Sequence, residues 1–213
     1  MKAHRKLIGR TALVAGTGVA ALVLAACGGN GGNSAHDMRA MGQTTSPPSA
    51  TASAKAGDRN AADVSFAKDM IQHHRQAVEM AVLADTRASS AETKDLATKI
   101  KSAQDPEIKT MSGWLTSWGE EVPADMSGQG HDMSSGMPGM MSMADMEKLK
   151  SSTGAEFDKL FAEMMIKHHE GAIEMAKAEK MGGKYELAKK LADEVIKAQT
   201  AEIEQMKKML DMS

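Results

Sequence analysis

Residues 66–81 read FAKDMIQHHRQAVEMA, and residues 161–176 read FAEMMIKHHEGAIEMA. Both stretches place apolar or small side chains at steps of three and four residues, which lines one face of an α-helix. In the first stretch this stripe contains Phe66, Met70, His73, Ala77 and Met80. Both stretches are therefore predicted to be helices whose buried stripe includes a histidine.

The two stretches belong to an internal repeat with an offset of 95 residues, which continues to AQDPEIKTM at 103–111 and AQTAEIEQM at 198–206. Short turns join the two segments of each half, with Ser89 or Ser90 as an N-cap and Gly182 and Gly183 as a C-cap, so each half is predicted to be a helical hairpin. Two hairpins with one apolar face each must pack together. The sequence thus predicts an all-α four-helix bundle over residues 61–213, in which Pro106 causes a kink or short break near Asp105.

The first 27 residues resemble a bacterial lipoprotein signal. Basic residues from Lys2 to Arg10 precede an apolar run that ends at LAAC, residues 24–27, which holds the only cysteine. We expect cleavage after residue 26 and lipid attachment to Cys27, with a plain transmembrane anchor as the alternative. Residues 27–60, rich in Gly, Ser, Thr, Ala and Pro, are predicted to be a flexible tether, so the folded part would lie outside the cytoplasm at the bacterial cell membrane.

The net charge argues against nucleic acid as a partner. The chain has 26 Lys and Arg against 28 Asp and Glu, and loss of the four basic residues of the leader would leave 22 against 28. A protein that binds a phosphate backbone needs an excess of positive charge.

Each His-His pair follows a methionine by one helical turn, so a thioether and an imidazole can reach one ion. This soft to intermediate donor set suits copper, above all Cu(I). The residues concerned are Met70, His73 and His74 in the first half, and Met165, His168 and His169 in the second. Buried, hydrogen-bonded histidines and core-filling methionines are the structural alternative.

The two members of each pair differ in position on the helix. His73 and His168 lie on the core stripe and are favoured as metal ligands. His74 and His169 lie at its edge, where they would face solvent, the linker or a second ion.

Polar residues also recur on the inward faces of the second segments: Gln104, Glu107, Gln199 and Glu202. Each is expected to orient a histidine or to add a ligand, with an interhelical hydrogen bond as the alternative role. A di-iron oxidase would need Glu-x-x-His motifs, and no acidic residue stands three positions before any histidine of the two pairs. Iron chemistry is therefore the minority interpretation.

Residues 119–152 are predicted to be a Met-rich linker between the two halves. Gly and Ser surround its methionines, so a hydrophobic core is not expected to account for them, whereas flexible thioether groups can wrap a soft cation. The candidates for metal capture are His131, Met133, Met137, Met140, Met141 and Met143. A low-complexity linker is the alternative.

FAKDMIQHHRQAVEMA, IKSAQDPEIKTMSGWL, MPGMMS and MIKHHEGAIEMA together resemble the domain of unknown function 305 family, over residues 61–212. The resemblance implies an exported or lipid-anchored helical bundle of ferritin-like type, and some members are linked to copper. Carried over residue by residue, it adds Met80 and Met175 to the ligand candidates, although spacing alone assigns Met80 to a second site or to packing.

The function expected from these features is that of a non-enzymatic, copper-binding lipoprotein that buffers or transfers Cu(I). A ferritin-like metal-dependent oxidase, or a helical interaction module without a metal, are the alternatives. A metal-accepting protein and a second copy of the chain stay open as partners.

Overall fold

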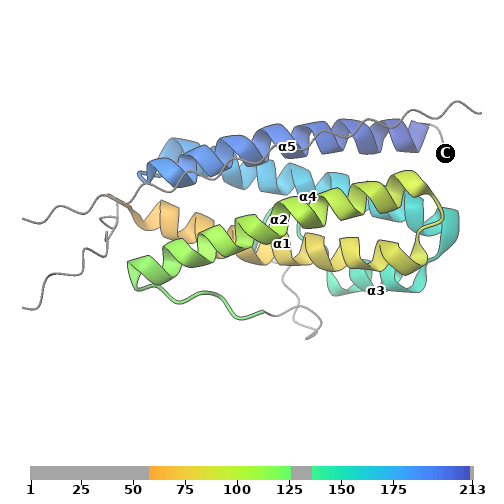
Figure 1. The fold of residues 1–213 in the computed structure, drawn as a ribbon, viewed down its shortest axis with the longest axis horizontal. Helices are drawn as coiled ribbons and strands as arrows, with labels where there is room; N and C mark the ends of the chain where they lie inside the picture. Colours follow the sequence, from red (N-terminus) through yellow and green to blue (C-terminus); the bar gives the residue numbers. More distant parts are fainter. Residues whose placement is uncertain (1–57, 126–135, 212–213) are drawn as a thin grey trace, which may run out of the picture. The chain divides into compact units, whose positions relative to one another are not determined.

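The structure, a computed structural model, describes residues 58–125 and 136–211, and these residues form five helices (Figure 1). The helices are α1 (Ala61–Arg87), α2 (Ala91–Trp118), α3 (Met143–Ser151), α4 (Gly154–Gly182) and α5 (Glu186–Asp211). No strand forms among the described residues, so the prediction of an all-α fold is confirmed for them. None of these helices combines the length and the apolar character that crossing a bilayer requires.

The four long helices pack as two hairpins. α1 lies against α2, α4 lies against α5, and the two hairpins meet through α1 and α4 (Figure 1). α1 and α4 run antiparallel, because the Asn60 side chain donates to the carbonyl of Gly182 at one end, while Ala88 pairs with Gly154 at the other. The predicted hairpins are therefore present.

The helix ends follow the local sequence signals. Asn60 caps α1 by accepting from the backbone N–H groups of Ala62 and Asp63, and Ser90 caps α2 by accepting from Thr93. α4 ends at Gly182, with Gly183 as its C-cap. α2 continues without a break through Pro106, so the short break expected near this residue does not occur.

Two aspartates at equivalent positions of the repeat hold the hairpins together. Asp158, in the first turns of α4, accepts hydrogen bonds from the N–H groups of Ser89 and Ser90 in the α1–α2 turn, at 3.2 and 3.0 Å. Asp63, at the start of α1, accepts from Lys184 and Tyr185 in the α4–α5 turn, at 2.9 and 2.8 Å. Each hairpin thus closes the turn of the other, and the sequence repeat corresponds to an approximate two-fold symmetry.

Glu179 breaks this symmetry beside Asp63, because the first half has Ala84 at the equivalent position. Its side chain is buried, and burial, followed by the neighbouring carboxyl group of Asp63, raises the pKa of Glu179 to about 8. Burial also acts to raise the pKa of Asp63, but the hydrogen bonds from backbone N–H groups outweigh it and hold that pKa below its usual value.

The segment expected to be a linker contains a helix and part of the core. Ser142 begins α3 with a capping box to Asp145, and α3 packs against both α1 and α4. Met140, Met141 and Met146 are all buried, so the expectation that a core does not explain the linker methionines is wrong for these three.

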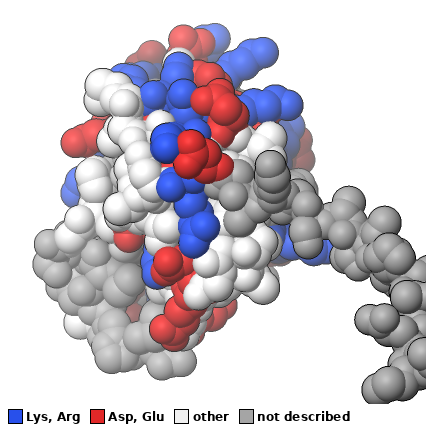
Figure 2. Space-filling view, turned by 90° about the vertical axis from the view of Figure 1, so that its left-hand side faces the viewer, with Lys and Arg blue, Asp and Glu red and all other residues white. Residues whose placement is uncertain are grey.

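Charges of both signs lie side by side at the end of the molecule where α1 begins (Figure 2). Two ion pairs belong to this end: Lys68 with Glu120 at 2.8 Å, and Lys184 with Asp58 at 2.7 Å. This face therefore has no field of a single sign.

Candidate metal centre

A layer of six buried polar side chains divides the hydrophobic core. It consists of His73 and His74 on α1, Gln104 on α2, His168 and His169 on α4, and Gln199 on α5, each at most 3% exposed. The apolar cluster on one side includes Met80, Ile100 and Met165, and the cluster on the other includes Met70 and Met111. We call these six residues the polar layer. Such burial of polar groups is costly unless each finds a partner.

His73 and His168 meet at the centre of the layer. Their ring centroids are 3.8 Å apart, and the ring planes are tilted by 41°. Nε2 of His73 donates to the carbonyl oxygen of Pro138 at 3.0 Å. His168 has no partner among the described residues at either ring nitrogen. The two histidines favoured as ligands are thus in direct contact with each other.

His74 and His169 each bond a glutamate on the second helix of their own hairpin. Nε2 of His74 lies 2.6 Å from Oε2 of Glu107, and Nε2 of His169 lies 2.7 Å from Oε2 of Glu202. Both imidazoles are fully buried, so of the three expectations for them, solvent, the linker or a second ion, the one that they face solvent is wrong. The reason is that α2 and α5 cover a second side of the helices that carry them. Glu107 and Glu202 are placed to orient these rings.

These contacts settle which nitrogen of His73 has a lone pair. A carbonyl oxygen cannot donate, so His73 carries its proton on Nε2 and presents a lone pair at Nδ1. Nδ1 of His73 is buried, with no partner among the described residues, and the same holds for Nδ1 of His74 and of His169. Unsatisfied acceptors of this kind cost about 1–3 kcal/mol each. An ion that accepts these lone pairs would remove that cost.

Burial keeps the central pair neutral. It lowers the pKa of His73 to about 3, with a further contribution from the neighbouring His74, and it lowers the pKa of His168 well below its usual value. A metal binds the neutral form of imidazole, so neither ring has to lose a proton before it coordinates near pH 7.

Methionines lie on both sides of the polar layer. Met70, Met80 and Met165 are fully buried, whereas Met175 is only partly buried. Met80 and Met175, which occupy equivalent positions of the sequence repeat, thus differ in burial. Gln104 and Gln199 each leave a buried side-chain oxygen, Oε1, without a partner among the described residues. They add two neutral oxygen donors to the layer.

Carboxylates do not gather here. Over the described residues, no three side chains of His, Cys, Asp or Glu come together as a metal site. The donors of the polar layer are instead imidazole and amide groups, and thioether groups lie on both sides of it; thioether and imidazole suit copper.

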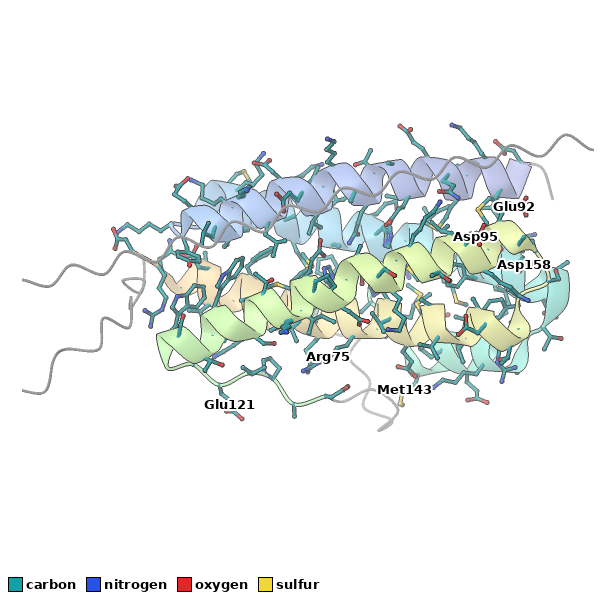
Figure 3. All side chains as sticks on the ribbon, in the orientation of Figure 1. Arg75, Glu92, Asp95, Glu121, Met143 and Asp158 are labelled. Carbon is teal, nitrogen blue, oxygen red and sulfur yellow. The ribbon has the colours of Figure 1, made fainter. Side chains whose placement is uncertain are left out.

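Residues 137–141, which we call the strap, cross the outer side of the central pair. Met140 and Met141 are buried within the strap, and Met137 is partly buried. Met143 follows at the start of α3, is 48% exposed and projects outward (Figure 3). The other linker candidates, His131 and Met133, lie outside the described residues, as do Cys27, the predicted leader and the tether up to residue 57.

Sequence reasoning missed the residues that hold the strap. The side chain of Gln76 donates to the carbonyl of Met141 at 2.9 Å and accepts from its N–H at 2.7 Å. The equivalent residue of the second half is Gly171, where an added Cβ would lie 2.0 Å from the Pro138 oxygen. A comparison of the two repeat copies gives the only sequence signal, because Gln and Gly differ strongly at this position.

A family model described as a domain of unknown function (DUF305) matches residues 63–210. A DUF305 crystal structure from Streptomyces coelicolor, described as that of a secreted protein, is 33% identical with a TM-score of 0.64 and covers 71% of this chain and 93% of its own. A DUF305 fragment from Deinococcus radiodurans is 26% identical with a TM-score of 0.64 and covers 72% of this chain and 98% of its own.

The protein CopM is also similar to this chain. Its Cu(II)-bound form is 37% identical with a TM-score of 0.61, and covers 70% of this chain and 95% of its own. CopM has also been solved in Cu(I)-bound and silver-bound forms. No curated protein matches this chain. Because the family model spans the helical part of the sequence and solved DUF305 structures share its fold, we conclude that this chain belongs to the DUF305 family.

Proposed function

We propose that this protein binds copper as cargo, outside the cytoplasm, and buffers or transfers it as Cu(I). The observation that carries the proposal is the set of buried imidazole nitrogens that have no partner among the described residues: Nδ1 of His73, His74 and His169, and both nitrogens of His168. A core that retains several polar nitrogen atoms without a hydrogen-bond partner at its centre is poorly explained by packing alone.

The chemistry of the layer selects the metal. Neutral imidazole and thioether groups are soft to intermediate donors, which hold Cu(I) well and compete poorly for magnesium or manganese. His73, His168 and one or more of Met70, Met80, Met165 and Met175 would hold the ion. Glu107 and Glu202 would fix the other two rings and supply negative charge near the layer. The copper-bound and silver-bound forms of CopM support this choice.

The remaining parts of the chain fit the same proposal. The Met-rich segment, with His131, Met133, Met137, Met140, Met141 and Met143, would capture the ion before it reaches the layer. Cys27 would carry a lipid, and residues 27–60 would tether the domain to the bacterial membrane. The secreted relative from Streptomyces supports a position outside the cytoplasm. The four long helices would constitute a ferritin-like four-helix bundle.

The alternative of a ferritin-like oxidase has less support. Such an enzyme needs several carboxylates around its metals, whereas each hairpin supplies one Glu–His pair to the layer. Oxygen consumption by the iron-loaded protein would favour the enzyme over the copper carrier.

Competition with a chelator of known Cu(I) affinity tests the proposal. We expect His73→Leu/His168→Leu to lower Cu(I) affinity at least tenfold, and His74→Leu/His169→Leu to lower it less, because the first pair lies at the centre of the layer. Met181→Leu is the control, since that methionine is 84% exposed. Unchanged affinity in both double variants, with a native circular dichroism spectrum, would overturn the proposal.

A further inference from the structure

The strap lies where the two halves of the repeat differ. Gln76 on α1 and Gly171 on α4 occupy equivalent positions, 95 residues apart, and the strap passes between them. Gln76 makes two hydrogen bonds to the backbone of Met141, and Gly171 leaves the space that the Pro138 carbonyl fills. α1 therefore binds the strap through Gln76, whereas α4 leaves space for it at Gly171.

The same segment closes over the central histidines. The Pro138 carbonyl accepts a hydrogen bond from Nε2 of His73, and Gly139 lies against the backbone of α4 at Lys167 and His168. Gly139 has a φ of 76°, which side chains rarely tolerate, so the strap can approach α4 this closely only with glycine there. Met140 and Met141 are buried as a result.

We propose that Gln76 is a positioning residue that holds the strap across the His73–His168 pair and thereby sets how fast copper enters and leaves. This inference rests on the proposed function, because it concerns exchange at the same site. Both side-chain hydrogen bonds of Gln76 go to the backbone of Met141, so Gln76 acts on the imidazoles through the strap.

The physical basis is that backbone N–H and C=O groups away from water need hydrogen-bond partners. If the Gln76 side chain is removed, the N–H and the C=O of Met141 lose their partner and recover one only by opening the strap to water. Alanine is a good helix former, so Gln76→Ala does not weaken α1 itself. We expect the open state of the strap to become about tenfold more populated.

Gln72 provides a matched control one turn earlier on α1. It is also a half-buried glutamine, and its side chain donates to the carbonyl of Ala124 at 3.1 Å, outside the strap. Gln72→Ala therefore removes the same side-chain amide and a comparable hydrogen bond to the connecting segment. It leaves the hydrogen bonds of the strap in place.

The first measurement uses the metal-free protein. Peroxide oxidation of Met140 and Met141, followed by mass spectrometry, reports how often the strap opens, with the exposed Met143 as an internal reference. We expect oxidation of Met140 and Met141 to become about tenfold faster in Gln76→Ala and to stay unchanged in Gln72→Ala. Equal rates in Gln76→Ala and the unmodified protein would overturn the positioning role, whether or not copper binds.

The second measurement follows removal of Cu(I) by an excess of chelator in a stopped-flow instrument. Gln76→Ala should release the metal about tenfold faster, while Gln72→Ala should match the unmodified protein. If Cu(I) binds, and is released at the same rate from both variants and from the unmodified protein, this inference is overturned and the proposed function stays intact. If the unmodified protein binds no Cu(I), the proposed function fails, and the control of exchange by Gln76 fails with it.

Discussion

The two hairpins of this protein, α1–α2 and α4–α5, are alike where they meet and different where the connecting segment passes. Both contribute a buried His-His pair, a glutamate bonded to its second histidine, and an aspartate that closes the other hairpin's turn. They differ at Gln76 and Gly171 beside the strap, and at the equivalent positions of Ala84 and Glu179, of which Glu179 lies beside Asp63. The shared features build the polar layer and join the hairpins. The difference between Gln76 and Gly171 fits this symmetric core to a connecting segment that is present only once.

The largest effect is expected from the two aspartates that join the hairpins. Asp63→Ala should lower the free energy of unfolding by about 3 kcal/mol, because it removes a fully buried carboxylate and leaves the N–H groups of Asn60, Lys184 and Tyr185 in partly buried positions without an acceptor. Asp158→Ala should cost about 1 kcal/mol, since its site is less buried and water can replace it. Urea denaturation measures both, and a larger loss for Asp158→Ala would contradict the comparison.

Two helical glycines test the asymmetry at the strap. Gly171→Ala should destabilise the protein by about 2 kcal/mol, because the added methyl group would overlap the Pro138 carbonyl. Gly113 on α2 has no neighbouring atom within 4 Å of an added Cβ. Gly113→Ala should therefore stabilise the protein by about 1 kcal/mol through helix propensity. Thermal denaturation separates the two, and the same sign of change in both would show that the strap does not pack against Gly171.

The stability of the protein should depend on pH through Glu179, and the variant Glu179→Ala, which has alanine at this position in both halves of the repeat, should lack this dependence. The pKa of Glu179 is about 8 in the folded protein and ordinary in the unfolded chain, so its contribution is complete below pH 4.5 and is lost as the pH rises through 8. Between pH 7 and pH 8 the unfolding free energy should fall by about 1 kcal/mol.

Glu179→Ala, which copies Ala84, should remove this slope. The central histidines do not interfere, because their lowered pKa values place their effect at acidic pH. Urea denaturation at pH 7.0, 7.5 and 8.0 provides the measurement. A slope that persists in Glu179→Ala would assign it to another group.

The smallest effect is expected at the methionines Met80 and Met175. Met80→Leu should cost less than about 1 kcal/mol, because the two side chains have similar volumes, but the fully buried site resists the change in shape. Met175→Leu should be close to neutral, because its side chain is only partly buried. Calorimetry of the metal-free variants would detect the difference in stability. A larger loss of stability in Met175→Leu than in Met80→Leu would contradict this prediction.

The sequence was sufficient to predict the four long helices, the two hairpins and four members of the polar layer: His73, Gln104, His168 and Gln199. Helical spacing identifies one buried stripe, and the repeat doubles the signal at each position. It was not sufficient for His74 and His169, which were predicted at an edge and are fully buried. A single stripe describes contact with one neighbour, whereas α1 and α4 each pack against two long helices, which buries a wider arc of their surface.

The strap and α3 show a second limit. α3 has a local sequence signal, because Ser142 and Asp145 have the spacing of a capping box. The Gly and Ser residues nearby nevertheless led to the prediction that the whole segment is a linker. The contacts of Gln76 with Met141 and of Gly171 with Pro138 join residues far apart in the chain. No local pattern encodes such pairs, so only the difference between the two repeat copies pointed to them.

The reciprocal closure of the turns by Asp63 and Asp158 has a consequence for the origin of the protein. Each hairpin supplies the acceptor that the other needs, and His73 of one faces His168 of the other, as in the isologous interface of a two-fold dimer. This chain carries that interface within one polypeptide. A single hairpin that paired with a second copy of itself would, once duplicated, give both this fold and the facing histidines.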